Sequence, residues 1–178
     1  MNAKIENQLK AIDIKLEQLL NDLKPHSDQL LNSKPNGHSW SVLQVMHHLM
    51  LAEDLSAKYV YKKLSFKPEL KNKSWLTGWR VFKLKTYNML PIKLKAPRNV
   101  SRENLPDHTS LEETRQQWLA QRAQLKRYLE TLPDELFEKE IYKHPLAGKL
   151  GLDGMLWFFE GHFDRHLVQI NRTLQKLS

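Results

Sequence analysis

The sequence predicts an all-α protein, a four-helix bundle with a crossover connection between two of its helices. Apolar residues recur at steps of three and four in four long segments, which is the period of an amphipathic helix. Prolines and turn-forming residues separate these segments. Since 178 residues are enough for one apolar core but few for two, we expect residues 1–178 to form a single domain.

The first two long helices have clear boundaries in the sequence. Residues 2–24 place apolar side chains along one helix face, and Pro25 ends the segment. A loop is expected to follow, with Pro35 and Gly37 as turn formers. The second long helix is expected to start at Ser41, because Ser41 and Gln44 match a capping box, and to end near Phe66.

The second half of the chain predicts one short and two long helices. The short helix is expected at residues 74–90. The third long helix opens at a second capping box, Ser110 to Glu113, and ends at Pro133. After a loop over residues 133–151, the last helix is expected from about Asp153 to Lys176. The long connection between the second and third long helices is what permits a crossover.

The net charge of +8 is concentrated in one segment. Residues 58–102 contain thirteen Lys and Arg against the single acid Glu69, together with the aromatic residues Trp75, Trp79, Phe82 and Tyr87. Such a mixture can follow a nucleic-acid strand, lie on an anionic membrane or attract an anionic substrate. We favour a solvated connection whose aromatic residues pack on the core, because charge runs are usually surface and these aromatics are irregularly spaced.

The chain contains no cysteine, so disulfides, thiolate ligands and cysteine nucleophiles are all excluded. A metal ion would need His, Asp or Glu ligands. The N-terminal segment mixes charges into its apolar pattern, unlike a signal peptide, and no apolar run reaches the roughly 18 residues of a membrane span. We therefore expect a cytoplasmic protein.

Two histidines share the apolar face of the last helix. Met155, Phe159, His162, His166 and Ile170 follow one another at steps of three and four, so both imidazoles point inward, one turn apart. They can bind one ion, or they can be two hydrogen-bonded core residues. The general-base glutamate of a zinc protease is missing, because Phe163 follows His162. Asp164 lies about 200 degrees around the helix and is expected to be exposed.

A third ligand is expected from a facing helix. His48 shares an inward stripe with Val45 and Ala52, whereas His47 is rotated by about 100 degrees. Periodicity therefore favours His48. Gln44 and Gln169 lie about one turn from His48 and His166 and could orient their rings, although Gln44 suits a capping role equally well. The remaining candidates, His38, His108 and His144, are interpreted as surface residues.

Two stretches of the sequence together resemble a known family. Residues 40–49, WSVLQVMHHL, and residues 144–170, HPLAGKLGLDGMLWFFEGHFDRHLVQI, are similar to the tryptophan and histidine motifs of the DinB-like family, which includes the YfiT-type metal-dependent hydrolases. The resemblance implies a four-helix bundle with a divalent metal, zinc or nickel, on His48, His162 and His166. The extra His47 and the Gly151-Leu152 helix start depart from the family pattern.

The function that follows from these residues is a metal-dependent reaction. Some members of the family are similar to thiol transferases and others to a maleylpyruvate isomerase. We expect a hydrolase or a thiol S-transferase in which the metal activates water or a low-molecular-weight thiol. The alternative is a non-catalytic metal-binding stress or interaction protein. The expected partner is a thiol or anionic small molecule, with no nucleic acid and no membrane; a homodimer is left open.

Overall fold

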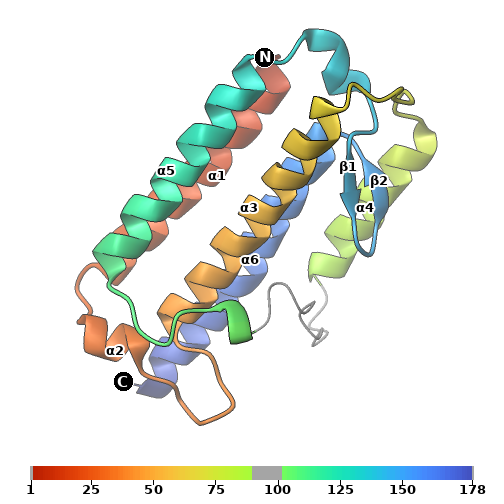
Figure 1. The fold of residues 1–178 in the computed structure, drawn as a ribbon. Helices are drawn as coiled ribbons and strands as arrows, with labels where there is room; N and C mark the ends of the chain where they lie inside the picture. The colour runs from red at the N-terminus through yellow and green to blue at the C-terminus, as the bar shows by residue number, and fades with distance from the viewer. Residues whose placement is uncertain (1, 90–101, 178) are drawn as a thin grey trace.

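Four long helices form the body of the protein in a computed structural model that describes residues 2–89 and 102–177. They are α1 (Ala3–Leu23), α3 (Val42–Ser65), α5 (Leu111–Glu130) and α6 (Leu152–Leu177). Helices α3 and α5 run in the same direction along the bundle (Figure 1), so the chain between them has to return to the end at which α3 begins. The expected all-α bundle with a crossover is confirmed.

Side-chain caps fix where the helices begin. Ser41 accepts a hydrogen bond from the backbone N–H of Gln44, and the Gln44 side chain accepts one from Ser41, which completes the predicted capping box. The second capping box, between Ser110 and Glu113, starts α5 in the same way. Helix α1 begins at Asn2, whose side chain accepts from the N–H of Ile5. Both capping boxes read from the sequence are therefore confirmed.

Two of the expected loops contain regular structure. The segment after Pro25 holds the short helix α2 (Asp28–Asn32), capped by Ser27. The loop expected at 133–151 contains a 3-10 turn, η3 (Asp134–Glu138), and an antiparallel hairpin of β1 (Tyr142–His144) and β2 (Gly148–Leu150). Strands of three residues are too short for their periodicity to stand out in a sequence, which is why the hairpin was not predicted.

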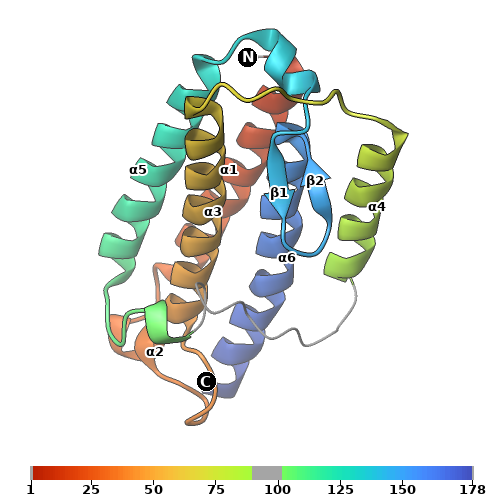
Figure 2. The ribbon, with the colours of Figure 1, turned by 45° about the vertical axis from the view of Figure 1, so that its right-hand side comes forward.

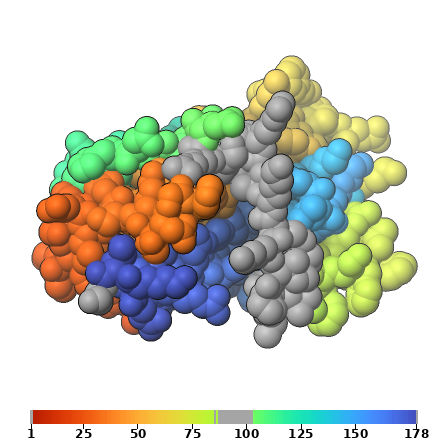
Figure 3. All heavy atoms as spheres, turned by 90° about the horizontal axis from the view of Figure 1, so that it is seen from below, coloured from red at the N-terminus to blue at the C-terminus, as the bar shows by residue number. Residues whose placement is uncertain are grey.

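Helix α4 (Trp75–Met89) lies outside the four-helix body, against α6 and β2 (Figure 2). Its bounds agree with the short helix expected at 74–90. A 3-10 turn, η2 (Arg102–Asn104), follows the undescribed residues and leads toward α5. The end view in Figure 3 shows α2 and the start of α5 on one side of the molecule, and α4 with the hairpin on the other.

The core is divided by a buried ion pair. One apolar cluster surrounds the hairpin end of the bundle and includes Ile12 and Ala57, while the other surrounds the α2 end and includes Leu16 and Met50. Glu53 lies between them on α3 and accepts three hydrogen bonds, from Trp118 Nε1 at 2.9 Å and from Arg122 at 3.1 and 2.8 Å. The bundle thus contains a charged layer whose polar atoms are paired.

None of the described helices combines the length and the apolar composition that crossing a lipid bilayer requires.

Candidate metal centre

Three histidines from two facing helices converge in the interior of the bundle. His162 and His166 lie one turn apart on α6, and their Nε2 atoms are 3.0 Å apart. His48 on α3 brings its Nε2 to 3.2 Å from that of His162. The nitrogens that the three rings offer all lie within 4.8 Å of one another. The structure therefore brings together the three residues that the sequence predicted as metal ligands.

The hydrogen bond of His166 Nδ1 determines which ring nitrogen carries the proton. Nδ1 lies 2.8 Å from the side-chain oxygen Oε1 of Gln169. An amide oxygen can only accept, so the proton of the neutral ring sits on Nδ1 and the lone pair of Nε2 faces His162. A histidine that donates its outer N–H to a carbonyl oxygen is the usual arrangement behind a bound metal. Gln169 thus lies where the sequence expected it.

Burial keeps the α6 pair uncharged. The pKa of His166 is lowered to about 3, first by burial and then by the neighbouring His48. Burial, together with the other two histidines, also lowers the pKa of His162 well below its usual range. Since only the neutral ring has a lone pair to donate, both imidazoles are ready to bind a cation at neutral pH.

The spacing of the three nitrogens fits a divalent metal. Metal–nitrogen bonds of about 2.0–2.1 Å at tetrahedral angles would separate the ligand atoms by roughly 3.3 Å. The two measured separations, 3.0 and 3.2 Å, are close to that value. Two lone pairs that face each other at this distance repel unless a proton or a cation lies between them. The cluster is therefore a group that could hold a metal ion, as the geometry of the described residues indicates.

Aromatic rings enclose the three histidines. The Trp40 ring packs against His48 with centroids 4.9 Å apart, and Phe158 stacks on His162 at 5.1 Å and 17°. Phe158 also contacts His144, with ring centroids 4.6 Å apart. These rings limit the access of water around the nitrogen cluster, which strengthens electrostatic interactions inside it.

The interpretation of His144 as a surface residue is wrong. His144 is buried on β1, and its Nδ1 accepts hydrogen bonds from the backbone N–H groups of Leu146 and Ala147. Burial lowers its pKa to about 4. Its burial depends on the hairpin folding back onto α6, a long-range contact that local sequence patterns do not report. His38 and His108, which were also interpreted as surface residues, are exposed as expected.

His47, the neighbour of His48 on α3, points away from the cluster. His47 Nε2 lies 3.1 Å from Thr114 Oγ1 on α5. The Thr114 hydroxyl already donates its proton to the Ser110 carbonyl, so His47 is the donor in this bond. The rotation read from the sequence thus separates His47 from His48 in the structure. Asp164, which the sequence placed on the outer face of α6, is exposed and pairs with Lys15.

Gln44 is engaged at the start of α3. Its side-chain oxygen accepts from the N–H of Ser41, and its amide nitrogen donates to the carbonyl of Pro106 at 3.1 Å. The structure therefore gives Gln44 a capping role that also ties α3 to the chain before α5. Its expected role behind His48 stays a prediction.

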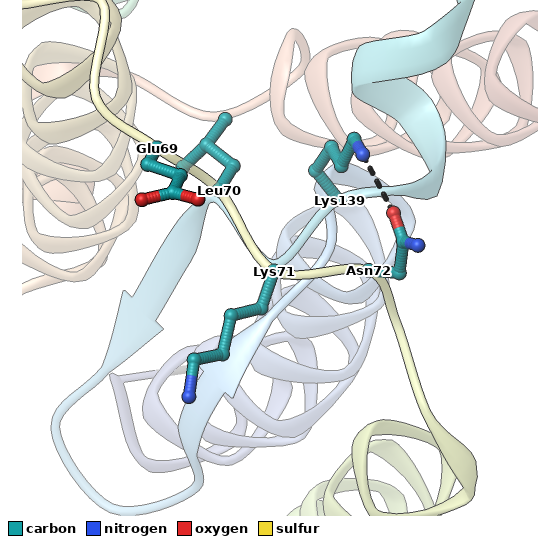
Figure 4. Close-up of a pocket in the computed structure, with 5 residues that line it drawn as sticks. All are labelled: Glu69, Leu70, Lys71, Asn72 and Lys139. Carbon is teal, nitrogen blue, oxygen red and sulfur yellow. Dashed lines mark hydrogen bonds between the residues drawn. The ribbon is translucent and has the colours of Figure 1, made fainter.

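A surface hollow of about 450 Å³ lies away from these histidines (Figure 4). It is formed where the chain before α4 passes the chain before β1, and its lining residues are Glu69, Leu70, Lys71, Asn72 and Lys139. Lys139 Nζ donates to Asn72 Oδ1 at 2.6 Å across it. The hollow is polar and open, and none of the three histidines lines it, so we assign the candidate chemistry to the histidine cluster.

Comparison with known proteins agrees with this geometry. The DinB superfamily model matches residues 9–170, a range that includes all three histidines. The chain belongs to the DinB superfamily. Within it, the chain is similar to the uncharacterized protein YuaE of Bacillus subtilis (strain 168), with 27% identity over 163 residues that cover 88% of this chain and 91% of the relative. This DinB-superfamily chain thus carries a three-histidine group compatible with metal binding.

Proposed function

We propose that the protein is a metal-dependent enzyme, a hydrolase or a thiol S-transferase, with zinc or nickel on His48, His162 and His166. The observation that carries the proposal is the convergence of the three Nε2 atoms, 3.0 and 3.2 Å apart, with His48 buried and the two α6 rings half-buried and neutral. Three neutral ligands leave the full charge of a divalent ion available to a substrate.

Each part of the chain has a distinct role in this proposal. A divalent ion on three imidazoles supplies a Lewis acid that lowers the pKa of water or of a thiol. Gln169 holds the His166 ring through Nδ1, so that Nε2 keeps its lone pair toward the site. Trp40 and Phe158 restrict water around the reacting groups. The helices α3 and α6 fix the three rings before any ligand arrives, which limits the entropy lost on binding.

The alternative is a non-catalytic metal-binding stress or interaction protein. One observation favours it: the metal-binding group found in the described residues consists of histidines alone, without a carboxylate that could act as a general base. A hydrolase commonly uses such a base, whereas a thiol transferase could rely on a metal that lowers the pKa of its thiol substrate. The two readings differ in turnover and not in metal content.

The test is metal content followed by turnover. The protein is purified without a histidine tag, and its zinc and nickel are measured by elemental analysis. The chelated protein is then reloaded and assayed for ester and amide hydrolysis and for conjugation of small thiols to electrophiles. We expect one equivalent of metal and a metal-dependent rate that His166→Ala abolishes. If the protein holds metal but turns over no substrate in any of these assays, the non-catalytic alternative is favoured. If it holds no stoichiometric metal, both the enzyme proposal and the non-catalytic alternative are rejected.

A further inference from the structure

Helix α4 presents large aromatic side chains to solvent. Trp75, Trp79 and Phe82 are 84%, 51% and 58% exposed. They follow one another at steps of four and three, so they share one face of the helix. The sequence-based expectation that these aromatics pack on the core is therefore wrong for all three, and their spacing, described as irregular from the sequence, is helical. The Tyr87 side chain lies outside the described residues.

The opposite face of α4 anchors the helix firmly. Leu84 and Thr77 are buried, and the Thr77 hydroxyl donates to Glu140 Oε1 at 2.6 Å. Arg80 donates to the same carboxylate at 3.3 Å and to the carbonyl of Lys149 on β2 at 3.2 Å. Thr77 and Arg80 are thus turned toward the protein, while both tryptophans of α4 are turned outward. This is the reverse of the usual surface helix, so the outer face needs another explanation.

Basic side chains accompany this face. Lys83 directly follows Phe82 and is exposed, and Lys67 and Lys71, shortly before the helix, are exposed as well. The only acid between residues 58 and 102 is Glu69. Aromatic residues on one face of a helix, with a lysine beside them and further lysines in the adjoining chain, resemble the composition of helices that lie in the interface of an anionic bilayer.

We propose that the outer face of α4 docks on the surface of an anionic lipid bilayer, which departs from the expectation from the sequence that the protein has no membrane partner. Tryptophan suits the headgroup layer because its ring is apolar and its N–H is polar. The lysines would meet anionic headgroups, whose negative surface potential attracts basic side chains near the bilayer. The protein would lie on the membrane and not cross it, and none of the described helices could cross it. This proposal does not depend on the metal site.

Two other occupants fit the surface less well. A second copy of the chain would place the same basic residues against themselves across a twofold axis, where they repel. A nucleic-acid strand would need a groove with open aromatic faces for its bases. Here the aromatics stand on a convex helix, and Trp79 and Phe82 stack on each other at 5.6 Å and 23°. Charge complementarity therefore favours the anionic bilayer.

The experiment measures binding to vesicles. The full-length protein is sedimented with vesicles of phosphatidylglycerol or of phosphatidylcholine, at low and at physiological salt. We expect binding to phosphatidylglycerol, weaker binding as salt rises, and at least tenfold weaker binding to phosphatidylcholine. The double variant Trp75→Ser/Trp79→Ser should bind phosphatidylglycerol at least tenfold more weakly, and Lys83→Glu about fivefold more weakly. Ile14→Ser, an exposed apolar residue on α1, is the matched control and should bind like the parent.

Several results would overturn the proposal. The proposal is wrong if the parent does not bind phosphatidylglycerol vesicles, or if the parent and the double variant bind them equally. A parent that sediments as a dimer in solution, with a monomeric double variant and no vesicle binding, would identify a second copy as the occupant. Circular dichroism checks that the double variant is folded, and the single variant Trp75→Ser, at the most exposed position, repeats the test with the least disturbance of the helix.

Discussion

At the scale of single residues, the neighbours His47 and His48 have different contacts because a helix rotates by about 100 degrees per residue. His48 faces His162, whereas His47 donates to Thr114 on α5. The sequence could predict this division because Val45 and Ala52 mark the inner face of α3 on either side of His48. Periodicity of apolar residues is enough to orient a side chain when the helix is long.

The first prediction separates these two histidines. His48→Ala should lower the affinity for zinc at least a hundredfold, because it removes one of three ligands. His47→Ala should change it by no more than a few fold. Isothermal titration of the chelated proteins at neutral pH measures both. Equal losses in the two variants would contradict the assignment of His48 as the third ligand.

The second prediction concerns the two glutamines. Gln169→Ala removes the acceptor of the His166 Nδ1 proton and should weaken metal binding about 10- to 100-fold, with little effect on stability. Gln44→Ala removes its capping bonds and should lower the free energy of unfolding by about 0.5–2 kcal/mol, with metal affinity unchanged. Zinc titration and urea unfolding of both variants distinguish the roles. A large loss of affinity in Gln44→Ala would instead support its expected place behind His48.

At the scale of elements, the four long helices and the 15-residue helix α4 could be predicted from the sequence, and the shorter pieces between them could not. Four or more turns of apolar periodicity, with serine caps, define α3 and α5 in the sequence. By contrast α2 has five residues and each strand has three, so their formation depends on contacts with distant parts of the chain. The outward face of α4 was also missed, because aromatic residues at helical spacing look the same in sequence whether they face a core or solvent.

The buried pair of Glu53 and Arg122 ties three elements together. Arg122 on α5 pairs with Glu53 on α3 and also donates to the Ile12 carbonyl on α1 at 2.6 Å. Both charged side chains are almost completely buried. Such a pair adds little net stability over an apolar pair, but removal of one partner leaves the other as an uncompensated buried charge.

The third prediction follows from that asymmetry. Glu53→Ala should lower the free energy of unfolding by about 3–5 kcal/mol, because Arg122 then stays buried without its main partner. Lys15→Ala, which removes partly exposed ion pairs with Glu160 and Asp164, should cost less than about 1 kcal/mol. Urea unfolding of the three proteins under one set of conditions gives the comparison. Similar losses in both variants would mean that the Glu53 pair is not desolvated in solution.

At the scale of the whole molecule, buried neutral histidines make stability depend on pH. His144, His162 and His166 all have a pKa below the usual 6.5 because they are buried. The unfolded chain therefore binds protons first as the pH falls. Above about pH 6.5 these histidines are neutral in both states and the free energy of unfolding is at its full value. Below that pH it falls progressively, until the pH reaches the pKa of each histidine in the folded chain, which is about 4 for His144 and about 3 for His166.

The last prediction isolates the share of His144, which lies outside the metal cluster. Asparagine in its place keeps an acceptor for the N–H groups of the hairpin turn but does not titrate. In chelator, the parent should therefore lose about 1 kcal/mol more stability than His144→Asn when the pH is lowered from 6 to 5, since one histidine proton is worth up to about 1.4 kcal/mol per pH unit. Urea unfolding at both pH values measures the difference. His38→Asn, at an exposed loop position, is the matched control, and its free energy of unfolding should fall between pH 6 and pH 5 by as much as that of the parent. If the stability of His144→Asn fell by as much as that of the parent, His144 would have to bind its proton equally in the folded and unfolded chains, which is incompatible with its burial between the hairpin and α6.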